Sequence, residues 1–193
     1  MMSVLRRLAT LVRAVALLAT TAAAQAPSVL HTFDGVTAGT PIGGLTTGRD
    51  GLLYGTTFNG GAGGTVFRIA TDGTGFEILH TFGDGSVADD GLNPGYGALV
   101  QDVDGLFYGT TVGGGAFGGG TLFRLDARGT TPVLDILVSF DGALAYPEAG
   151  VIVGSDGLLY GTTGSGSPSP GAVYRVWRDG SNLEVLYTFT ATD

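Results

Sequence analysis

Short segments rich in apolar, β-branched and aromatic residues recur along most of the chain, separated by turns rich in glycine and aspartate. A first motif, Gly-Leu-Leu/Phe-Tyr-Gly-Thr-Thr, stands directly after an aspartate at 51–57, 105–111 and 157–163. A second motif, of the form Thr-Val-Phe-Arg-Ile, stands at 65–69, 121–125 and 172–176. A third, which ends in phenylalanine, stands at 79–82, 137–140 and 186–189. Apolar segments of this length between turn residues predict β-strands.

The shared order and spacing of these motifs predict an internal repeat of three units, at about 34–82, 83–140 and 141–189. Each unit is expected to form four antiparallel strands, which in the middle unit lie at 98–102, 106–111, 121–126 and 133–140. The aspartate before each first motif and the glycine that begins the motif form an Asp-Gly pair, which suits a tight hairpin because glycine accepts a positive φ. Outside the amino-terminal region no helical period is present, so we expect essentially no helix.

The predicted strands do not alternate cleanly between apolar and polar residues. In the segment 52–57 both faces carry apolar or small side chains, whereas a sheet with one face in water would alternate. Four-stranded antiparallel sheets that are covered on both faces by similar sheets are the blades of a β-propeller. We therefore expect an all-β, β-propeller-like fold. A stacked β-solenoid and an open β-sandwich are the alternatives.

A fourth copy of the third motif, Leu-His-Thr-Phe at 30–33, precedes the first unit and predicts a leading strand at 28–33. Three four-stranded blades and this strand are fewer than a closed propeller needs, since closed propellers have about four to eight blades. We expect an incomplete, open propeller. It is either a truncated product or an arc that self-associates to complete the propeller.

The first 24 residues differ from the rest of the chain. Their only charged residues are three arginines, an apolar run follows at 14–19, and Ala22-Ala23-Ala24 has the small-residue form that signal peptidase accepts. We expect a signal peptide at 1–24 and a mature repeat region at 28–193, secreted or held at the cell surface. A membrane anchor would need about 20 predominantly apolar residues, and Arg13 interrupts this run.

The composition excludes several classes of function. The chain has 193 residues, 36 glycines and no cysteine, which excludes disulfides, thiolate metal sites and cysteine nucleophiles. Removal of the signal peptide leaves six arginines against all 17 acidic residues, a formal charge of −11. Nucleic acids and anionic membranes bind proteins through basic side chains, so neither is an expected partner.

The links between units and the loops between second and third strands lie on one face of a propeller, and they are the long loops of this chain. The link at 83–94 carries Asp84, Asp89, Asp90 and Asn93, and Glu148 follows the next link. These five residues form the candidate ligand face, for a cation or the hydroxyl groups of a glycan, with a solvated polar loop as the alternative. Acids from different blades, such as Asp89, Asp90 and Glu148, would serve a glycan-active hydrolase or lyase.

Residues that recur at one position of every unit are interpreted as structural. They are Tyr54, Tyr108, Tyr160, Arg68, Arg124 and Arg175, and the arginines are expected to bind carbonyls or carboxylates of the neighbouring unit. His31 and His80 share one repeat position and are interpreted in the same way. Asp102 and Asp104 resemble the start of a calcium loop, but the other oxygen ligands of that motif do not follow them.

The repeat resembles the GloVer repeat of choice-of-anchor tandem repeat proteins. The shared pattern is Asp-Gly-x-Leu-Tyr-Gly-Thr-Thr, a glycine-rich gap, Gly-Thr-Val-Phe-Arg-Leu and a terminal Leu-His-x-Phe, and it covers about 28–193 three times over. The third copy departs most, with Ala172-Val173-Tyr174 in place of Thr-Val-Phe. The resemblance implies an exported, surface-associated, propeller-like bacterial protein. It implies no catalytic activity, because repeats define the family.

We therefore expect an exported, non-enzymatic repeat protein, without catalytic residues, cofactor or metal, that acts as an extracellular scaffold and binds a surface glycan or a protein. The alternative is a fragment of a propeller-type glycan-active hydrolase or lyase. A purely structural wall component is a third hypothesis.

Overall fold

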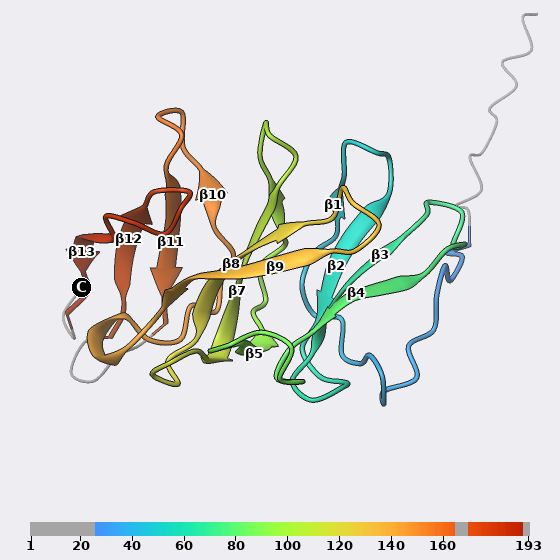
Figure 1. Cartoon of the computed structure of the whole chain (residues 1–193), viewed down its shortest axis with the longest axis horizontal. Coiled ribbons are helices and arrows are strands. Elements are labelled where there is room, and N and C mark those ends of the chain that lie inside the picture. Colours follow the sequence, from blue (N-terminus) through green and yellow to red (C-terminus); the bar gives the residue numbers. More distant parts are fainter. Residues whose placement is uncertain (1–25, 165–169, 191–193) are drawn as a thin grey trace, which may run out of the picture.

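The computed structural model describes residues 26–164 and 170–190, which form three antiparallel β-sheets side by side along the long axis of the molecule (Figure 1). The first sheet has the order β1-β2-β3-β4 and the third has the order β10-β11-β12-β13. The middle sheet runs β5-β7-β8-β9, and β6 also pairs with β7. The expected signal peptide at 1–24 lies outside the described residues.

The bounds of the elements follow the repeat. The first sheet contains β1 (Thr46–Thr47), β2 (Leu53–Thr57), β3 (Thr65–Ile69) and β4 (Glu77–Thr81). The middle sheet contains β5 (Gly91–Pro94), β6 (Val100–Gln101), β7 (Phe107–Gly114), β8 (Thr121–Asp126) and β9 (Val133–Ser139). The third contains β10 (Ile152–Val153), β11 (Leu159–Thr163), β12 (Ala172–Val176) and β13 (Glu184–Thr188). A single 3-10 turn, η1 (Gly142–Leu144), is the one helical element of the described ranges.

The all-β, open, propeller-like arrangement is confirmed, and so are the four strands expected in the middle unit. One loop was predicted wrongly. The end of the link at 83–94 forms β5, in which Gly91 pairs with Gly114 and Pro94 with Thr111 of β7. It can do so because β7 extends past the short strand β6 and offers the rest of its edge to a second partner.

The leading strand at 28–33 was also predicted wrongly, since this segment pairs with no sheet. Its side chains anchor it instead. The rings of Phe33 and Phe67 have centroids 5.2 Å apart, and His31 stacks on Phe76 at 3.8 Å. The segment therefore covers the first sheet by packing, without adding a strand to it.

An aromatic ring covers a glycine at the centre of each sheet. The pairs across the strands are Gly55 with Phe67, Gly109 with Phe123 and Gly161 with Tyr174. A Cβ atom would come within 2.7 Å of the ring at Gly55 and within 2.5 Å at Gly109. The glycine of the Tyr-Gly-Thr-Thr motif is thus required because the ring of the next strand occupies the space a side chain would need.

Each outer strand carries a β-bulge at the same place, opposite Val66/Phe67, Leu122/Phe123 and Val173/Tyr174. A bulge inserts one extra residue and redirects the side chains beside it. In β9, the successive residues Leu137 and Val138 consequently both pack into the core between the second and third sheets. The bulges are one reason why the strands do not alternate cleanly.

Two clusters of buried residues fill the spaces between successive sheets. Phe82, just after β4, is buried with its ring centroid 5.2 Å from that of Phe123 in the second sheet. Phe140, just after β9, repeats this contact with Tyr174 of the third sheet, again at 5.2 Å. Burial of one such aromatic side chain contributes about 2 to 3 kcal/mol. The phenylalanine that ends each repeat therefore joins one sheet to the next.

The backbones of the second and third sheets meet at Gly97 and Gly150. A Cβ atom on Gly97 would lie 1.8 Å from the amide nitrogen of Gly150, so Gly97→Ala must separate the inner edges of two sheets. We expect the free energy of unfolding, measured by urea titration, to fall by about 3 kcal/mol or more. Gly113→Ala is the control, because its Cβ would meet Leu92 at an ordinary 3.8 Å. Equal losses in the two variants would contradict this account.

Tyr174 has a buried hydroxyl group without a hydrogen-bond partner among the described residues, and burial raises the pKa of this phenol above its ordinary value. The equivalent residues of the other sheets are Phe67 and Phe123. We expect Tyr174→Phe to raise the free energy of unfolding by about 1 kcal/mol, since an unsatisfied buried polar group is removed. Tyr54→Phe should lower it instead, because that hydroxyl donates to Asp50 at 2.7 Å. Thermal or urea melting of both variants checks the opposite signs.

Stability should fall in acid. The Arg128 guanidinium lowers the pKa of Asp126 from 3.8 to about 2, and the Thr37 hydroxyl lowers the pKa of Asp34. The unfolded chain then takes up protons before the folded chain does, so this stabilisation is complete above about pH 4 and is lost as the pH falls to about 2. Thermal melting across this range should show the drop, and Asp126→Asn should make it shallower. An unchanged Tm across the range would contradict the prediction.

Candidate functional site

The link at 83–94 departs from the corresponding link at 141–147, because it is longer and carries three aspartates. Its first part turns over the end of β4 before the chain enters β5. Asp90, at the end of this turn, reaches back to His80 of β4. The turn is thereby closed by a contact between two side chains.

His80 and Asp90 form a buried pair. The Nε2 atom of His80 lies 3.0 Å from Oδ2 of Asp90, and the side chains are only 8% and 5% exposed. The Asp90 carboxylate also accepts hydrogen bonds from the amides of Gly83 and Gly91, both at 2.8 Å. Because carboxylate oxygens accept, Nε2 carries the proton and Nδ1 is left for another partner. Asp90 thus fixes the orientation of the imidazole ring.

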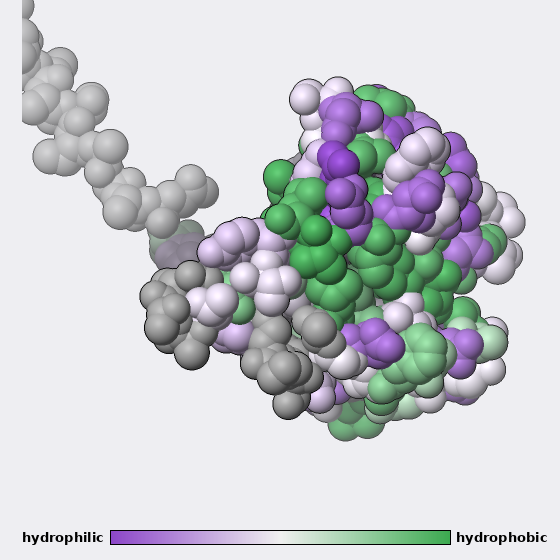
Figure 2. Space-filling view, turned by 90° about the vertical axis from the view of Figure 1, so that its left-hand side faces the viewer, coloured by the Kyte–Doolittle hydropathy of each residue, from purple (hydrophilic) through white to green (hydrophobic). Residues whose placement is uncertain are grey.

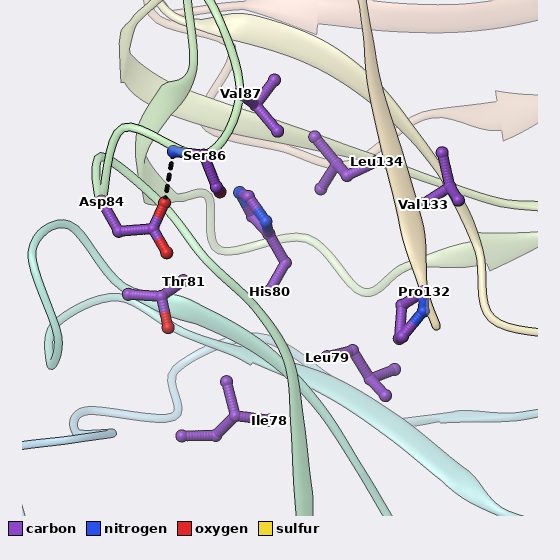
Figure 3. A pocket seen from close by; sticks show the side chains of 10 residues that line it. All are labelled: Ile78, Leu79, His80, Thr81, Asp84, Ser86, Val87, Pro132, Val133 and Leu134. Atoms are coloured by element: carbon purple, nitrogen blue, oxygen red, sulfur yellow. Dashed lines mark hydrogen bonds between the residues drawn. The ribbon is translucent and has the colours of Figure 1, made fainter. Parts of the chain in front are cut away.

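An open groove of about 510 Å³ lies beside this pair, between the outer strands β4 and β9 of adjacent sheets (Figure 3). Its polar wall comes from β4 and the link, and its apolar wall comes mainly from the start of β9. The lining residues are Ile78, Leu79, His80, Thr81, Asp84, Ser86, Val87, Pro132, Val133 and Leu134.

Asp84 is the carboxylate of the polar wall. Its Oδ1 accepts a hydrogen bond from the amide of Ser86 at 2.8 Å, drawn in Figure 3. Hydrogen bonds from the side chain and backbone of Ser86 lower the pKa of Asp84 below its ordinary value. Asp84 is therefore ionised at neutral pH and presents an acceptor to the groove. Together with the hydroxyls of Thr81 and Ser86, it offers both donors and acceptors opposite an aliphatic surface.

The five residues of the predicted ligand face are only partly brought together. Asp84 lines the groove and Asp90 lies behind it. Asp89 is exposed in the same link, with a φ of 52°. Asn93 points elsewhere and donates to the carbonyl of Phe58 at 2.9 Å. Glu148 lies directly after the next link, and its backbone carbonyl accepts a hydrogen bond from the amide of Tyr96 at 2.7 Å.

Sequence reasoning missed the main partners of Asp84 and Asp90 in this site. His80 was interpreted as structural because His31 shares its repeat position, yet the later units carry Val138 and Tyr187 there. This change of residue type between the units was the available sign that His80 has a role other than holding the repeat together. No signal pointed to the start of β9, because Val133 reaches the groove only through the packing of two sheets.

The recurring arginines pair within their own sheets. Arg68 contacts Glu77 at 2.7 Å, Arg124 contacts Asp135 at 2.6 Å and Arg175 contacts Glu184 at 2.7 Å. The expectation that they bind the neighbouring unit was therefore wrong, since each carboxylate stands directly opposite on the adjacent strand. Of the recurring tyrosines, Tyr54 and Tyr108 are buried, while Tyr160 donates to Asp156 at 2.7 Å.

Asp102, just after β6, is buried and forms an ion pair with the guanidinium of Arg178 in the turn that follows β12 of the third sheet. Asp104 accepts from the amide of Leu106 at 3.0 Å within its own turn. Across the described ranges, no three His, Asp or Glu side chains are placed to hold a metal ion.

A second cavity, of about 530 Å³, lies between the first two sheets at the Asp-Gly turns. Much of its charge is already paired. Arg68 is paired with Glu77, Arg128 contacts Asp126 at 2.6 Å, and Asp50 accepts from Tyr54. The groove beside His80 is therefore the stronger candidate for a ligand.

Comparison with known proteins identifies the repeat and little else. The sequence model of the Gloeobacter/Verrucomicrobia repeat matches residues 15–193. No curated protein matches the chain. Among solved structures, a gluconolactonase from Xanthomonas campestris is similar at 19% identity with a TM-score of 0.47, over 74% of this chain and 44% of that one. The chain thus spans less than half the length of that enzyme. In the part of the chain described, no helix is long and apolar enough to cross a membrane.

Proposed function

Because the chain belongs to the Gloeobacter/Verrucomicrobia repeat family, we propose that it is an exported, non-enzymatic scaffold that binds a glycan in the groove between β4 and β9. The observation that carries the proposal is the break in the repeat at 83–94, which forms the groove around the buried His80–Asp90 pair. The repeats supply the sheets, and this longer link supplies Asp84, Ser86 and Val87 to the groove.

The chemistry of the groove suits a sugar. Sugars present hydroxyl groups on their edges and C–H groups on their ring faces. The hydroxyls would find Asp84, Ser86 and Thr81 on one wall, and the C–H face would lie on Pro132 and Val133 opposite. Nδ1 of His80 adds a group that accepts when the ring is neutral, because Nε2 is held by Asp90.

A glycan ligand also agrees with the charge of the chain. The mature part has a formal charge of −11, which disfavours polyanionic ligands, whereas neutral or basic sugars carry no such repulsion. An exterior location follows from the signal peptide expected at 1–24 and belongs to the same proposal.

A hydrolase is the second candidate, because a histidine oriented by a buried carboxylate is a common acid–base group in catalysis. Such a histidine, His80, lines the groove together with Ser86, and its partner Asp90 lies behind the groove. Incubation of bound glycans with the protein distinguishes the two functions. Reducing ends that accumulate without an unsaturated sugar product, with the parent chain and not with His80→Gln, would establish the hydrolase.

Binding should depend on the polar wall. We expect Asp84→Ala to weaken the binding of a glycan selected on an array by about tenfold, as measured by calorimetry, because a charge-assisted hydrogen bond to a sugar hydroxyl is lost. Val133→Asp should weaken it too, since a charge would replace the apolar wall, where Val133 is exposed. Both positions are exposed, so the fold should be retained.

Asp141→Ala is the matched control. Asp141 is an exposed aspartate of the next link and lies outside the groove. It should bind the glycan as the parent chain does. Equal binding by all three variants would refute the groove as the site, and the absence of any glycan ligand on the array would refute the proposed class.

A further inference from the structure

The third sheet has an apolar face on the side away from the other two sheets. Figure 2 looks onto this end and shows a hydrophobic band across it. Phe82 and Phe140, which join successive sheets, are 0% and 1% exposed, whereas Phe189 at the same repeat position is 40% exposed. Leu186 and Tyr187 beside it are also exposed. The third sheet therefore exposes side chains at the repeat positions that the first two sheets bury.

Phe189 is held as its counterparts are. Its amide donates to the carbonyl of Gly171 at 2.9 Å, as the amide of Phe82 does to Gly64 and that of Phe140 to Gly120. The backbone therefore already has the geometry that it has within the two internal interfaces. Little ordering would be required to seat this residue on another sheet.

The first sheet carries the complementary face at the other end of the molecule. Leu45 is 54% exposed, while its counterparts Leu99 and Val151, each packed against a preceding sheet, are 4% exposed. A cavity of about 260 Å³ opens beside it, lined mainly by apolar residues that include Leu53, Phe67 and Ile69. This socket matches the faces that receive Phe82 and Phe140.

The leading segment partly occupies the socket. Phe33 lies 5.2 Å from Phe67, the distance that separates Phe82 from Phe123 and Phe140 from Tyr174. In contrast with the strand-bound Phe189, no backbone hydrogen bond joins residues 26–33 to the first sheet in the described ranges. Phe33 thus holds the place of a preceding sheet through side-chain contacts alone.

We propose that two copies of this chain associate head to tail, with the third sheet of each seated on the first sheet of the other and Phe189 in the place that Phe33 holds. A second copy is the occupant because the exposed Phe189 of the third sheet and the exposed Leu45 face of the first sheet correspond to the two sides of the contact that joins successive sheets within the chain. Two copies supply six sheets, which lies within the range of about four to eight in closed propellers. In this association Phe189 of one copy replaces Phe33 of the other against the first sheet, and Leu45 and Leu186 become buried in addition.

The proposal is independent of the glycan groove, which lies between two sheets of one chain. Light scattering coupled to size exclusion tests it over a range of protein concentrations. The expected mass is that of two chains, falling to that of one chain on dilution. Phe189→Asp and Leu45→Asp should each give a single-chain mass, because a charge would be buried in both interfaces. Phe117→Asp, at an exposed aromatic residue in the turn between β7 and β8, is the control and should leave the two-chain mass unchanged.

Mixing the two interface variants provides the decisive measurement. The intact third sheet of Leu45→Asp can still seat on the intact first sheet of Phe189→Asp, so the mixture should recover a two-chain mass that neither variant forms alone. Circular dichroism confirms that each variant is folded. A parent chain that stays single at every concentration overturns the proposal and leaves a sheet of another protein as the occupant. A mixture without recovery overturns the head-to-tail geometry.

Discussion

The structure depends on the contact between the phenylalanine that ends one sheet and the aromatic ring at the centre of the next. Phe82 on Phe123 and Phe140 on Tyr174 bury large aromatic side chains between the sheets, and the glycines opposite Phe123 and Tyr174 leave the space that these rings need. A sheet of this kind is apolar on both faces, so it is stable only where another sheet covers it. The bulges of the outer strands serve the same end by directing successive apolar residues toward one neighbour.

This constraint explains what could be predicted from the sequence. The strands at 106–111 and 121–126 were found correctly because their pairing is local and the glycine and aromatic positions match in every unit. The tetrapeptide Leu-His-Thr-Phe shows where such reasoning fails. At 79–82 its first three residues form the end of β4, but at 30–33 it forms no strand, because the free edge of β3 accepts one partner and β4 occupies it. The difference lies in the neighbours and not in the four residues.

The candidate site shows the same limit. His31 and His80 have identical local sequences, yet His31 stacks on Phe76 while His80 binds Asp90. Asp84 and Asp90 could be selected from the sequence alone, because they stand in a link that is longer and more acidic than the corresponding link at 141–147. Their connection to Val133 could not, since that residue lies more than 40 positions away and reaches the groove through the packing of separate sheets. Function in a repeat chain is therefore best sought where the repeat is interrupted.

The proposed glycan groove and the proposed head-to-tail association together determine the number of binding sites in the assembly. The groove belongs to an interface inside one chain, so association through the end sheets leaves it intact and gives an assembly of two copies two grooves. Surface glycans are themselves repetitive, and a second groove on the same particle converts a second binding event into an intramolecular one. Weak binding at a single open groove then suffices for firm attachment. An arc of three sheets that closes with its own copy would thus strengthen binding without any change in the residues that contact the sugar.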